Sequence, residues 1–248
     1  MERLKNKVVL VTGGSGGIGS EICRLCVSEG AKVIINYNSD SANALKLAKE
    51  LGSHAIAIQA DVTDPNAVHS MVQQALNRFK SIDVLVNNAS GPILPKRFQT
   101  LEWSDVQKDI TVHLGGSFYC IQSVLPSMIQ QKKGSIINIL STYALGKPPV
   151  MLSSYVSAKS ALMGLSKSLA SELAAYQIRV NMVSPGITQT DAIAHLSEET
   201  LRQKTQEIPL KRIATPKEIA QTIVFLASDE SQYLTGSNIV VSGGSIMP

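Results

Sequence analysis

A short apolar run that ends in a glycine cluster constrains the fold of this chain more than any other feature. Val8–Val11 is followed by Thr12-Gly13-Gly14-Ser15-Gly16-Gly17-Ile18-Gly19, and a helical stripe of apolar residues then continues to about Ser28. Glycine is needed where a chain turns tightly and where backbone must approach a ligand closely. A helix that begins after such a turn points its first N–H groups at an anion. The segment therefore predicts a site for the pyrophosphate of a dinucleotide, with contacts from Gly13, Ser15, Gly17, Ile18 and Gly19.

The rest of the chain alternates between apolar runs and helical stripes. We expect strands at 8–11, 31–37, 54–60, 82–86, 135–140, 178–183 and 238–241, and helices at 17–28, 41–51, 65–79, 101–131, 153–176 and 216–227. Strands that are apolar throughout are typical of a parallel sheet covered by helices on both faces. The pattern predicts the α/β class: a doubly wound (Rossmann) fold with a seven-stranded parallel sheet, in one domain spanning 1–248. The least regular stretch, 186–215, is interpreted as a mobile substrate lid.

Composition excludes several classes of protein. The net charge of +4 comes from 23 basic and 19 acidic residues that are scattered along the chain, which argues against a nucleic-acid partner. No apolar run reaches the roughly 18 residues that a membrane helix needs. The first residues carry no signal-peptide pattern, so we expect a cytoplasmic protein that binds no membrane.

The cysteines and histidines give no sign of redox or metal chemistry. Cys23 and Cys26 form a C-x-x-C pair, but they lie on the apolar stripe of a helix that has already begun, so we interpret them as core residues. The four histidines, His54, His69, His113 and His195, lack metal-ligand spacing, and no metal is predicted.

Six motifs along nearly the whole chain resemble those of classical short-chain dehydrogenases/reductases. They are Thr12-Gly13-x-x-x-Gly17-x-Gly19, Asp61-Val62, Asn87-Asn88-Ala89-Ser90, Asn138-Ile139-Leu140-Ser141, Tyr155-x-x-x-Lys159 and Pro185-Gly186, with a familiar Gly243-Gly244 near the end. The third motif departs from the family pattern by having serine in its last place. The resemblance implies a nicotinamide dinucleotide cofactor. It assigns cofactor contacts to Asp61, Val62, Asn88, Ala89, Tyr155, Lys159, Pro185, Gly186 and Thr188, beside those of the glycine turn.

The resemblance also implies the catalytic chemistry. Tyr155 would protonate the substrate oxygen, Lys159 would hold the nicotinamide ribose, and Ser141 would hydrogen-bond the substrate. Residues four apart share one helix face, so Tyr155 and Lys159 can enter one site. A nearby ammonium should lower the pKa of the Tyr155 phenol. The alternative is an ordinary pair of amphipathic side chains on a helix surface.

His113 is the main departure from the family pattern, because it stands where the family has a catalytic asparagine. Histidine both donates and accepts hydrogen bonds, so His113 could serve in a proton relay behind Lys159. In that case its titration near pH 6.5 predicts an added ionisation on the acid side of the activity profile. A buried structural histidine with no relay role is the other interpretation, and both stay open.

The substrate expected from the resemblance is a carbonyl compound, small or carrier-bound. The segments Ile35-Asn36-Tyr37-Asn38-Ser39 and Pro209-Leu210-Lys211-Arg212 look like those of 3-oxoacyl-[acyl-carrier-protein] reductases of fatty acid or polyketide biosynthesis. Lys132 and Lys133 could form a basic patch near the site for an acidic carrier protein, or they could simply complement the dipole at the C-terminus of a helix. A dehydrogenase of a small alcohol, sugar or secondary metabolite remains an alternative, as does a catalytically idle dinucleotide-binding sensor or scaffold.

The cofactor preference and the assembly state complete the expectations. Tyr37 stands at the end of the second strand, where NAD-specific members carry an acidic residue, so NADP(H) is favoured over NAD(H). The helices at 101–131 and 153–176 carry more apolar positions than one sheet face can cover. Together with the resemblance and a last strand at the sheet edge, this predicts a homotetramer.

Overall fold

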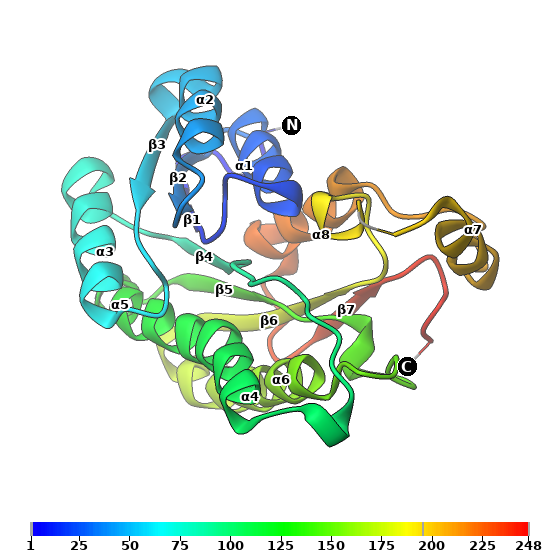
Figure 1. The fold of residues 1–248 in the computed structure, drawn as a ribbon. Coiled ribbons are helices and arrows are strands. Elements are labelled where there is room, and N and C mark those ends of the chain that lie inside the picture. The colour runs from blue at the N-terminus through cyan, green and yellow to red at the C-terminus, as the bar shows by residue number, and fades with distance from the viewer. Residues whose placement is uncertain (1, 195, 248) are drawn as a thin grey trace.

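The computed structural model describes residues 2–194 and 196–247, so Met1, His195 and Pro248 lie outside the described residues. One seven-stranded sheet runs through it in the order β3-β2-β1-β4-β5-β6-β7, and every neighbouring pair is parallel. The strands are β1 (Val8–Val11), β2 (Lys32–Tyr37), β3 (Ala55–Gln59), β4 (Val84–Asn87), β5 (Gly134–Ile139), β6 (Ile178–Pro185) and β7 (Asn238–Val241). The expected doubly wound α/β fold is confirmed (Figure 1).

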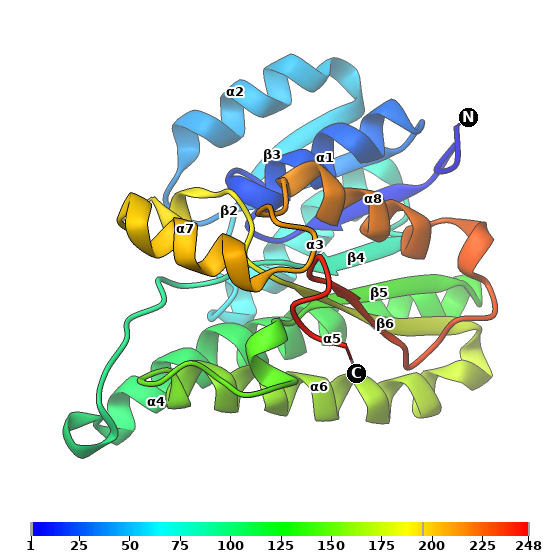
Figure 2. The same cartoon turned by 90° about the vertical axis from the view of Figure 1, so that its right-hand side faces the viewer.

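Helices cover both faces of the sheet. One face is covered by α1 (Gly17–Ser28), α2 (Ser41–Leu51) and α8 (Pro216–Ala227), and the other by α3 (Pro65–Phe79), α5 (Gly116–Gln131) and α6 (Ser153–Leu173) (Figures 1 and 2). Another helix, α4 (Trp103–Ile110), packs against α6. Strand β1 explains the all-apolar runs: Val9 and Val11 enter the core under α1 and α8, whereas Val8 and Leu10 enter the opposite core.

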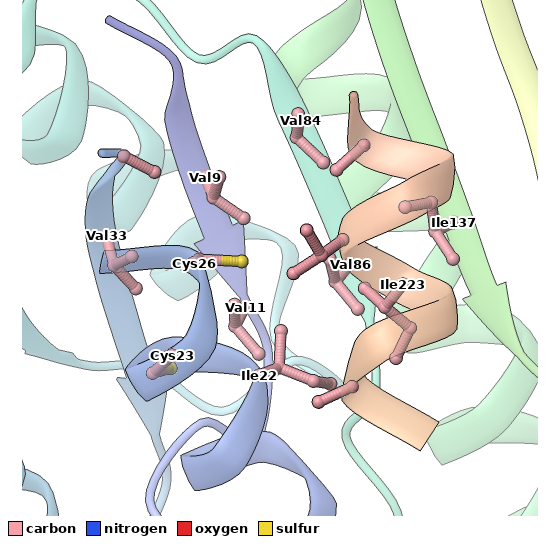
Figure 3. Packing of buried hydrophobic residues seen from close by; sticks show 14 of the residues in the cluster. Val9, Val11, Ile22, Cys23, Cys26, Val33, Val84, Val86, Ile137 and Ile223 are labelled. Atoms are coloured by element: carbon pink, nitrogen blue, oxygen red, sulfur yellow. The ribbon is translucent and has the colours of Figure 1, made fainter. Parts of the chain in front are cut away.

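The two cysteines of the C-x-x-C pair are core residues, as expected. Cys23 and Cys26 are fully buried beside Val9, Val11 and Ile22 (Figure 3). Burial raises the pKa of the Cys26 thiol to about 12 and that of Cys23 well above its usual range. A thiol that stays protonated is a poor nucleophile, so this pair is unsuited to redox exchange.

The single helix expected at 101–131 is interrupted in the structure. Helix α4 passes into a π-helical turn, Thr111–Gly115, before α5 begins. A π-helical turn inserts one residue into the helix and keeps the helix continuous. The apolar pattern of the sequence therefore does not reveal it. His113 lies at the centre of this turn.

The stretch 186–215, expected to be irregular, contains a helix, α7 (Glu198–Glu207). Ser197 caps it, since its hydroxyl accepts a hydrogen bond from the Thr200 N–H at 3.2 Å. No residue of α7 is buried, and the helix projects from the body of the molecule (Figure 1). It was missed because a helix with almost no apolar positions leaves no hydrophobic stripe to detect. Among the described residues, no helix is both long and apolar enough to cross a membrane.

Candidate active site

The candidate site lies where the strand order reverses. Strand β1 lies between β2 and β4, so the helices that follow β1 and β4 go to opposite faces and leave a crevice at the carboxyl ends of these strands. Thr12 ties the crevice together, because its Oγ1 accepts hydrogen bonds from the N–H groups of Asn88 and Ala89 at 2.9 and 3.0 Å. The Asn88 side chain donates back to the carbonyl oxygens of Thr12 and Gly13. The glycine turn after β1 is thus locked to the end of β4.

The glycine turn fits the pyrophosphate of a dinucleotide. Gly13 and Gly17 have φ of +59° and +43°, which side chains disfavour. A Cβ on Gly19 would lie 2.2 Å from the Gly13 carbonyl oxygen, so this position admits no side chain. Helix α1 starts here with Gly16 as its N-cap and without a side-chain cap. Its first N–H groups are therefore available to phosphate oxygens.

The residues expected to bind the adenosine half lie apart from the catalytic residues, beyond the glycine turn. Asn36, at the end of β2, supports the turn: its Oδ1 accepts from the Gly13 N–H and its Nδ2 donates to the Ala60 carbonyl. Tyr37 follows it and is half-buried. The Asp61 carboxylate accepts from the Thr63 N–H and hydroxyl, both at 2.8 Å, which fixes the turn after β3. Val62 is buried, and Gly116 lets α5 pass close over it.

A cavity of about 210 Å³ lies at the carboxyl ends of β4, β5 and β6. Of the expected residues it brings together Ile18 of the glycine turn, Asn88, Ser141, Tyr155, Lys159, Pro185, Gly186 and Thr188, whereas Ala89 does not line it. Sequence reasoning missed Tyr143, which lines the cavity two residues after Ser141, and Ile93, Ile187, Thr190 and Ile193, which make its wall largely apolar. The signal for Tyr143 was its position directly beyond the motif that ends in Ser141.

Three polar side chains meet in this cavity. Ser141 follows β5 and lines the cavity together with Tyr155, and its hydroxyl accepts a hydrogen bond from the Tyr143 N–H at 3.2 Å. The Lys159 ammonium donates to the Ile139 carbonyl at 2.8 Å and lies 5.8 Å from the centroid of the Tyr155 ring. Tyr155 and Lys159 are both buried, so they are not an ordinary pair of surface side chains on a helix.

Helix α6, which carries Tyr155 and Lys159, is held by buried polar contacts. Asn87 Nδ2 donates to Asn138 Oδ1, and Asn138 Nδ2 donates to Ser166 Oγ, both at 2.8 Å. This chain of bonds runs from β4 through β5 to α6. It fixes the height of α6 over the sheet and therefore the depth of Tyr155 in the cavity.

Burial shifts the pKa values of the two catalytic candidates in opposite directions. It raises the pKa of Tyr155 to about 12, although the hydrogen bond from Ser141 opposes the shift. It lowers the pKa of Lys159 to about 7, against the attraction of the Asp109 carboxylate. The pKa of Tyr155 is therefore raised rather than lowered as expected, because burial is its largest cause.

His113 lies behind Tyr155 and does not line the cavity. Its ring meets the Tyr155 ring edge-on, with centroids 5.2 Å apart and an interplanar angle of 87°. The side chain is buried, and its Nδ1 lacks a hydrogen-bond partner among the described residues. Burial, with the Lys159 charge adding to it, lowers the pKa of His113 to about 3. The ionisation expected near pH 6.5 is therefore displaced far below the working range.

Asp109 is a further group that sequence reasoning missed. It lies in the last turn of α4, two residues before the π-helical segment, and its charge raises the pKa of both Tyr155 and Lys159. The spacing of four residues between Asp109 and His113 was the available signal, because such residues share a helix face.

Lys132 and Lys133 do not lie near the cavity of their own chain. They come directly before β5, whereas Ser141 follows its carboxyl end. The six residues of β5 span about 20 Å at about 3.3 Å each. The two lysines therefore border the opposite edge of the sheet, where Lys133 lies 3.9 Å from Asp229. Within a single chain, these two lysines therefore form no basic patch beside the cavity.

Comparison with known proteins places the whole chain in one family. A family model described as enoyl-(acyl carrier protein) reductase matches residues 13–245. A 3-oxoacyl-[acyl-carrier-protein] reductase, FabG, of Staphylococcus epidermidis is 41% identical over 248 residues, covering 98% of this chain and 100% of the relative. A FabG of Thermotoga maritima is 37% identical, covering 99% of this chain and 100% of the relative. A reductase of the same name from Synechocystis is 38% identical and covers both chains completely. Together with the fold and the motif residues, these matches show that the chain belongs to the short-chain dehydrogenase/reductase family and is an oxidoreductase that uses a nicotinamide dinucleotide.

Proposed function

We propose that this chain reduces the ketone of a 3-oxoacyl thioester held on an acyl carrier protein. The observation that carries the proposal is the meeting of Ser141, Tyr155 and Lys159 in one buried cavity of a chain that matches such reductases over its full length. The cavity of about 210 Å³ suits the reacting end of an acyl chain rather than a whole bulky substrate.

Ser141, Tyr155 and Lys159 have different roles in the proposed reduction. The reduced nicotinamide, when bound, supplies a hydride to the carbonyl carbon. Ser141 donates a hydrogen bond to the carbonyl oxygen, and the Tyr155 phenol gives that oxygen its proton. With a pKa of about 12, the phenol holds its proton throughout the working range but is a weak acid, so the phenolate that it leaves needs a nearby cation. The Lys159 ammonium stabilises the phenolate left behind, and we assign it the nicotinamide ribose as a second partner.

The segment 186–215 is proposed to act as a lid over this cavity. Its first residues, among them Ile187, Thr188 and Ile193, line the cavity wall. Hydrogen bonds of the Gln189 N–H to the Ala214 carbonyl and of the Ala214 N–H to the Ile187 carbonyl join the two ends of the segment. Between these pinned ends α7 buries no side chain, so this helix can move at little cost in packing, whereas Ile208 after it is buried.

Preference for NADP(H) rests on the end of β2. No carboxylate stands at Tyr37 or at the exposed Asn38 that follows. The nearest acid along the chain, Asp40, is engaged as the N-cap of α2, where it accepts hydrogen bonds from Asn43. A Cβ added to Gly16 would have no atom within 4 Å, so there is open space beside this residue for a 2′-phosphate.

A homotetramer is proposed from the outer faces of α5 and α6. Between these helices lies an apolar groove of about 510 Å³ lined in part by Leu114, Phe118, Ala161 and Leu165, and Phe118 is 45% exposed. Strand β7 forms the free edge of the sheet and is only half-buried. A face of this kind is stabilised by a second copy packed across a two-fold axis.

Replacement of Tyr155 tests the reaction itself. Tyr155→Phe removes the proton donor and keeps the ring, so kcat for a 3-oxoacyl thioester should fall by about 10²–10⁴-fold while binding of the dinucleotide and thermal stability stay near wild type. Cofactor oxidation is measured over a panel of 3-oxoacyl thioesters, simple ketones and sugars. Tyr143→Phe, which alters the other tyrosine of the cavity, serves as the matched control and should retain most of its kcat. Full activity in Tyr155→Phe would overturn the mechanism, and turnover confined to sugars or simple ketones would overturn the substrate class.

Substitutions of His113 test whether its uncharged imidazole ring holds Tyr155 in position. His113→Asn should keep or raise kcat, and His113→Ala should lower kcat by about tenfold with little change in KM, since it leaves Tyr155 without its neighbour. Reduction needs the Lys159 ammonium, whose pKa is about 7, so wild-type kcat should decline as the pH rises above 7. Because His113 is neutral down to a pH of about 3, both variants should keep that profile. An acid-side ionisation near pH 6.5 that disappears in His113→Asn would contradict this assignment and restore a charged relay.

Cofactor preference is tested at Asn38. Wild type should favour NADP(H) over NAD(H) in kcat/KM by about tenfold or more, and Asn38→Asp should reverse part of that preference because a carboxylate there repels a 2′-phosphate and accepts from a ribose hydroxyl. Asp40→Asn keeps a good helix cap and removes the nearest existing charge, so it should leave the ratio unchanged or raise it. A wild-type ratio in favour of NAD(H) argues directly against the proposal.

The assembly state is tested by light scattering at micromolar protein concentration. Wild type should have the mass of four chains, and Phe118→Glu should have a smaller mass, since a buried charge in the groove is costly. Lys132→Glu, a surface charge change away from the groove, should leave the mass as it is. A monomeric wild type would show that the groove between α5 and α6 does not bind another copy.

A further inference from the structure

The segment that follows β7 turns back toward the loop that precedes α6. It runs from Ser242 to Met247 and contains Gly243 and Gly244, whose φ values are +63° and +89°. Glycine is favoured at such values, and two of them in succession reverse the direction of the chain. This glycine pair therefore brings Ile246 to the loop before α6, beside which the segment ends in Figure 1.

The segment 242–247 is anchored at its start. The Leu210 N–H donates to the Gly243 carbonyl at 3.1 Å, which ties the segment to the chain beyond α7. The buried Ser242 hydroxyl accepts from the Ile246 N–H and donates to the Ile246 carbonyl, both at 3.3 Å. The backbone of Ile246 is therefore held in a fixed place.

The side chain of Ile246 packs against the backbone of Gly146. A Cβ built on Gly146 would lie 2.6 Å from Ile246 Cδ1 and 3.8 Å from Ile246 Cγ1. Apart from the chain neighbours of Gly146, no other group in the described part of the chain comes within 4 Å of that point. Glycine thus leaves the space that Ile246 fills, and Ile246 is the contact on this side of the loop.

The loop around Gly146 has little other support from the interior. Lys147, Pro148 and Val150 are exposed, and the next buried side chain along the loop is that of Leu152. A loop with few buried groups is easily displaced. The contact from Ile246 therefore matters more here than it would in a packed core.

Gly146 comes just after a short turn that begins at Ser141. The Ser141 hydroxyl caps this 3₁₀ turn, Thr142–Ala144, by accepting from the Tyr143 N–H at 3.2 Å. The Leu145 N–H donates to the first carbonyl of the turn at 3.1 Å. Because the turn is closed by these bonds, a shift of Gly146 moves the turn and with it the Ser141 hydroxyl.

We propose that Ile246 is a positioning residue for Ser141, since it holds the turn that places the Ser141 hydroxyl in the cavity. Neither Ile246 nor Gly146 lines the cavity, so the effect passes through the turn. This inference rests on the proposed function, because it assumes that Ser141 hydrogen-bonds the substrate oxygen. Misplacement of an orienting group by about 1 Å can slow a reaction by about 10²-fold.

The test compares the loss of Ile246 with and without the Ser141 hydroxyl. Ile246→Ala should lower kcat by about tenfold for the N-acetylcysteamine thioester of a 3-oxobutyryl group, with little change in KM or in dinucleotide binding. Ser141→Ala should lower kcat by about 10²-fold. In the Ser141→Ala background, Ile246→Ala should have almost no further effect, because the group that it positions is gone. Losses that multiply in the double variant, or an unchanged kcat in Ile246→Ala, would overturn the proposal.

An exchange of size between the two residues tests the contact itself. Ile246→Val removes Cδ1, the atom closest to the point where a Gly146 Cβ would stand, and should lower kcat less than Ile246→Ala does. The φ of Gly146 is not positive, so alanine can adopt its backbone conformation. Gly146→Ala adds a methyl group at that point, so Ile246→Val/Gly146→Ala should regain the wild-type kcat. If the second substitution restores nothing, the contact does not act as proposed.

Met247→Ala is the matched control. It removes an apolar side chain that is 77% exposed from the same segment and should leave kcat and KM at their wild-type values. Light scattering is measured for each variant, and a smaller mass in Ile246→Ala would assign its loss of activity to assembly instead of Ser141.

Hydrogen exchange gives a measurement that needs no substrate. The N–H groups of Tyr143 and Leu145 should exchange about tenfold faster in Ile246→Ala and at the wild-type rate in Met247→Ala. Unchanged exchange in Ile246→Ala would overturn the positioning role whatever the substrate. If wild type reduces no 3-oxoacyl thioester, the proposed function fails, and the exchange of these N–H groups still tests Ile246.

Discussion

The hydroxyl of Thr12 is the contact on which the rest of the site depends. It accepts hydrogen bonds from two successive N–H groups at the end of β4, and Asn88 returns two more to the carbonyl oxygens of Thr12 and Gly13. These four hydrogen bonds join the turn after β1 to the end of β4, where the strand order of the sheet reverses. They hold the glycine turn in a backbone conformation that only glycine adopts easily, so the helix N-terminus and the catalytic cavity keep a fixed separation.

A second set of buried hydrogen bonds connects β4 and β5 to α6, the helix that carries Tyr155 and Lys159. Asn87, Asn138 and Ser166 link β4, β5 and α6 through contacts that exclude water. A buried polar group is stable only when it is paired, so such a chain selects one position of α6 over others. The cost of this arrangement is desolvation around Tyr155 and Lys159. That same desolvation moves the pKa of the phenol to about 12 and that of the ammonium to about 7.

The sequence predicted the structure correctly where only one kind of structure explains the residues present. The strands were recognisable because residues such as Val8 to Val11 are buried alternately on two faces, and the glycine turn because Gly19 admits no side chain. The sequence did not predict features that depend on how distant parts of the chain pack in three dimensions, or that leave no apolar pattern. A π-helical turn leaves the apolar stripe intact, α7 has no stripe, and the position of Lys132 near a helix end does not tell which edge of the sheet it borders. The pKa shifts depend on burial, and the spacing of Tyr155 and Lys159 contains no information about that.

The electrostatics of the site determine the protonation state in which Tyr155 would enter the proposed reaction. Alcohol oxidation requires a base that removes the hydroxyl proton, and a phenol with a pKa of about 12 is almost never ionised near neutral pH. Ketone reduction requires a proton donor, and the same phenol is then always in its active form. Lys159 reinforces the difference, because below its pKa of about 7 it is a cation able to stabilise the phenolate that reduction produces. His113 adds no opposing charge, since burial keeps it neutral beside the Tyr155 ring. In the proposed reduction, Tyr155 would therefore enter the reaction as a protonated phenol.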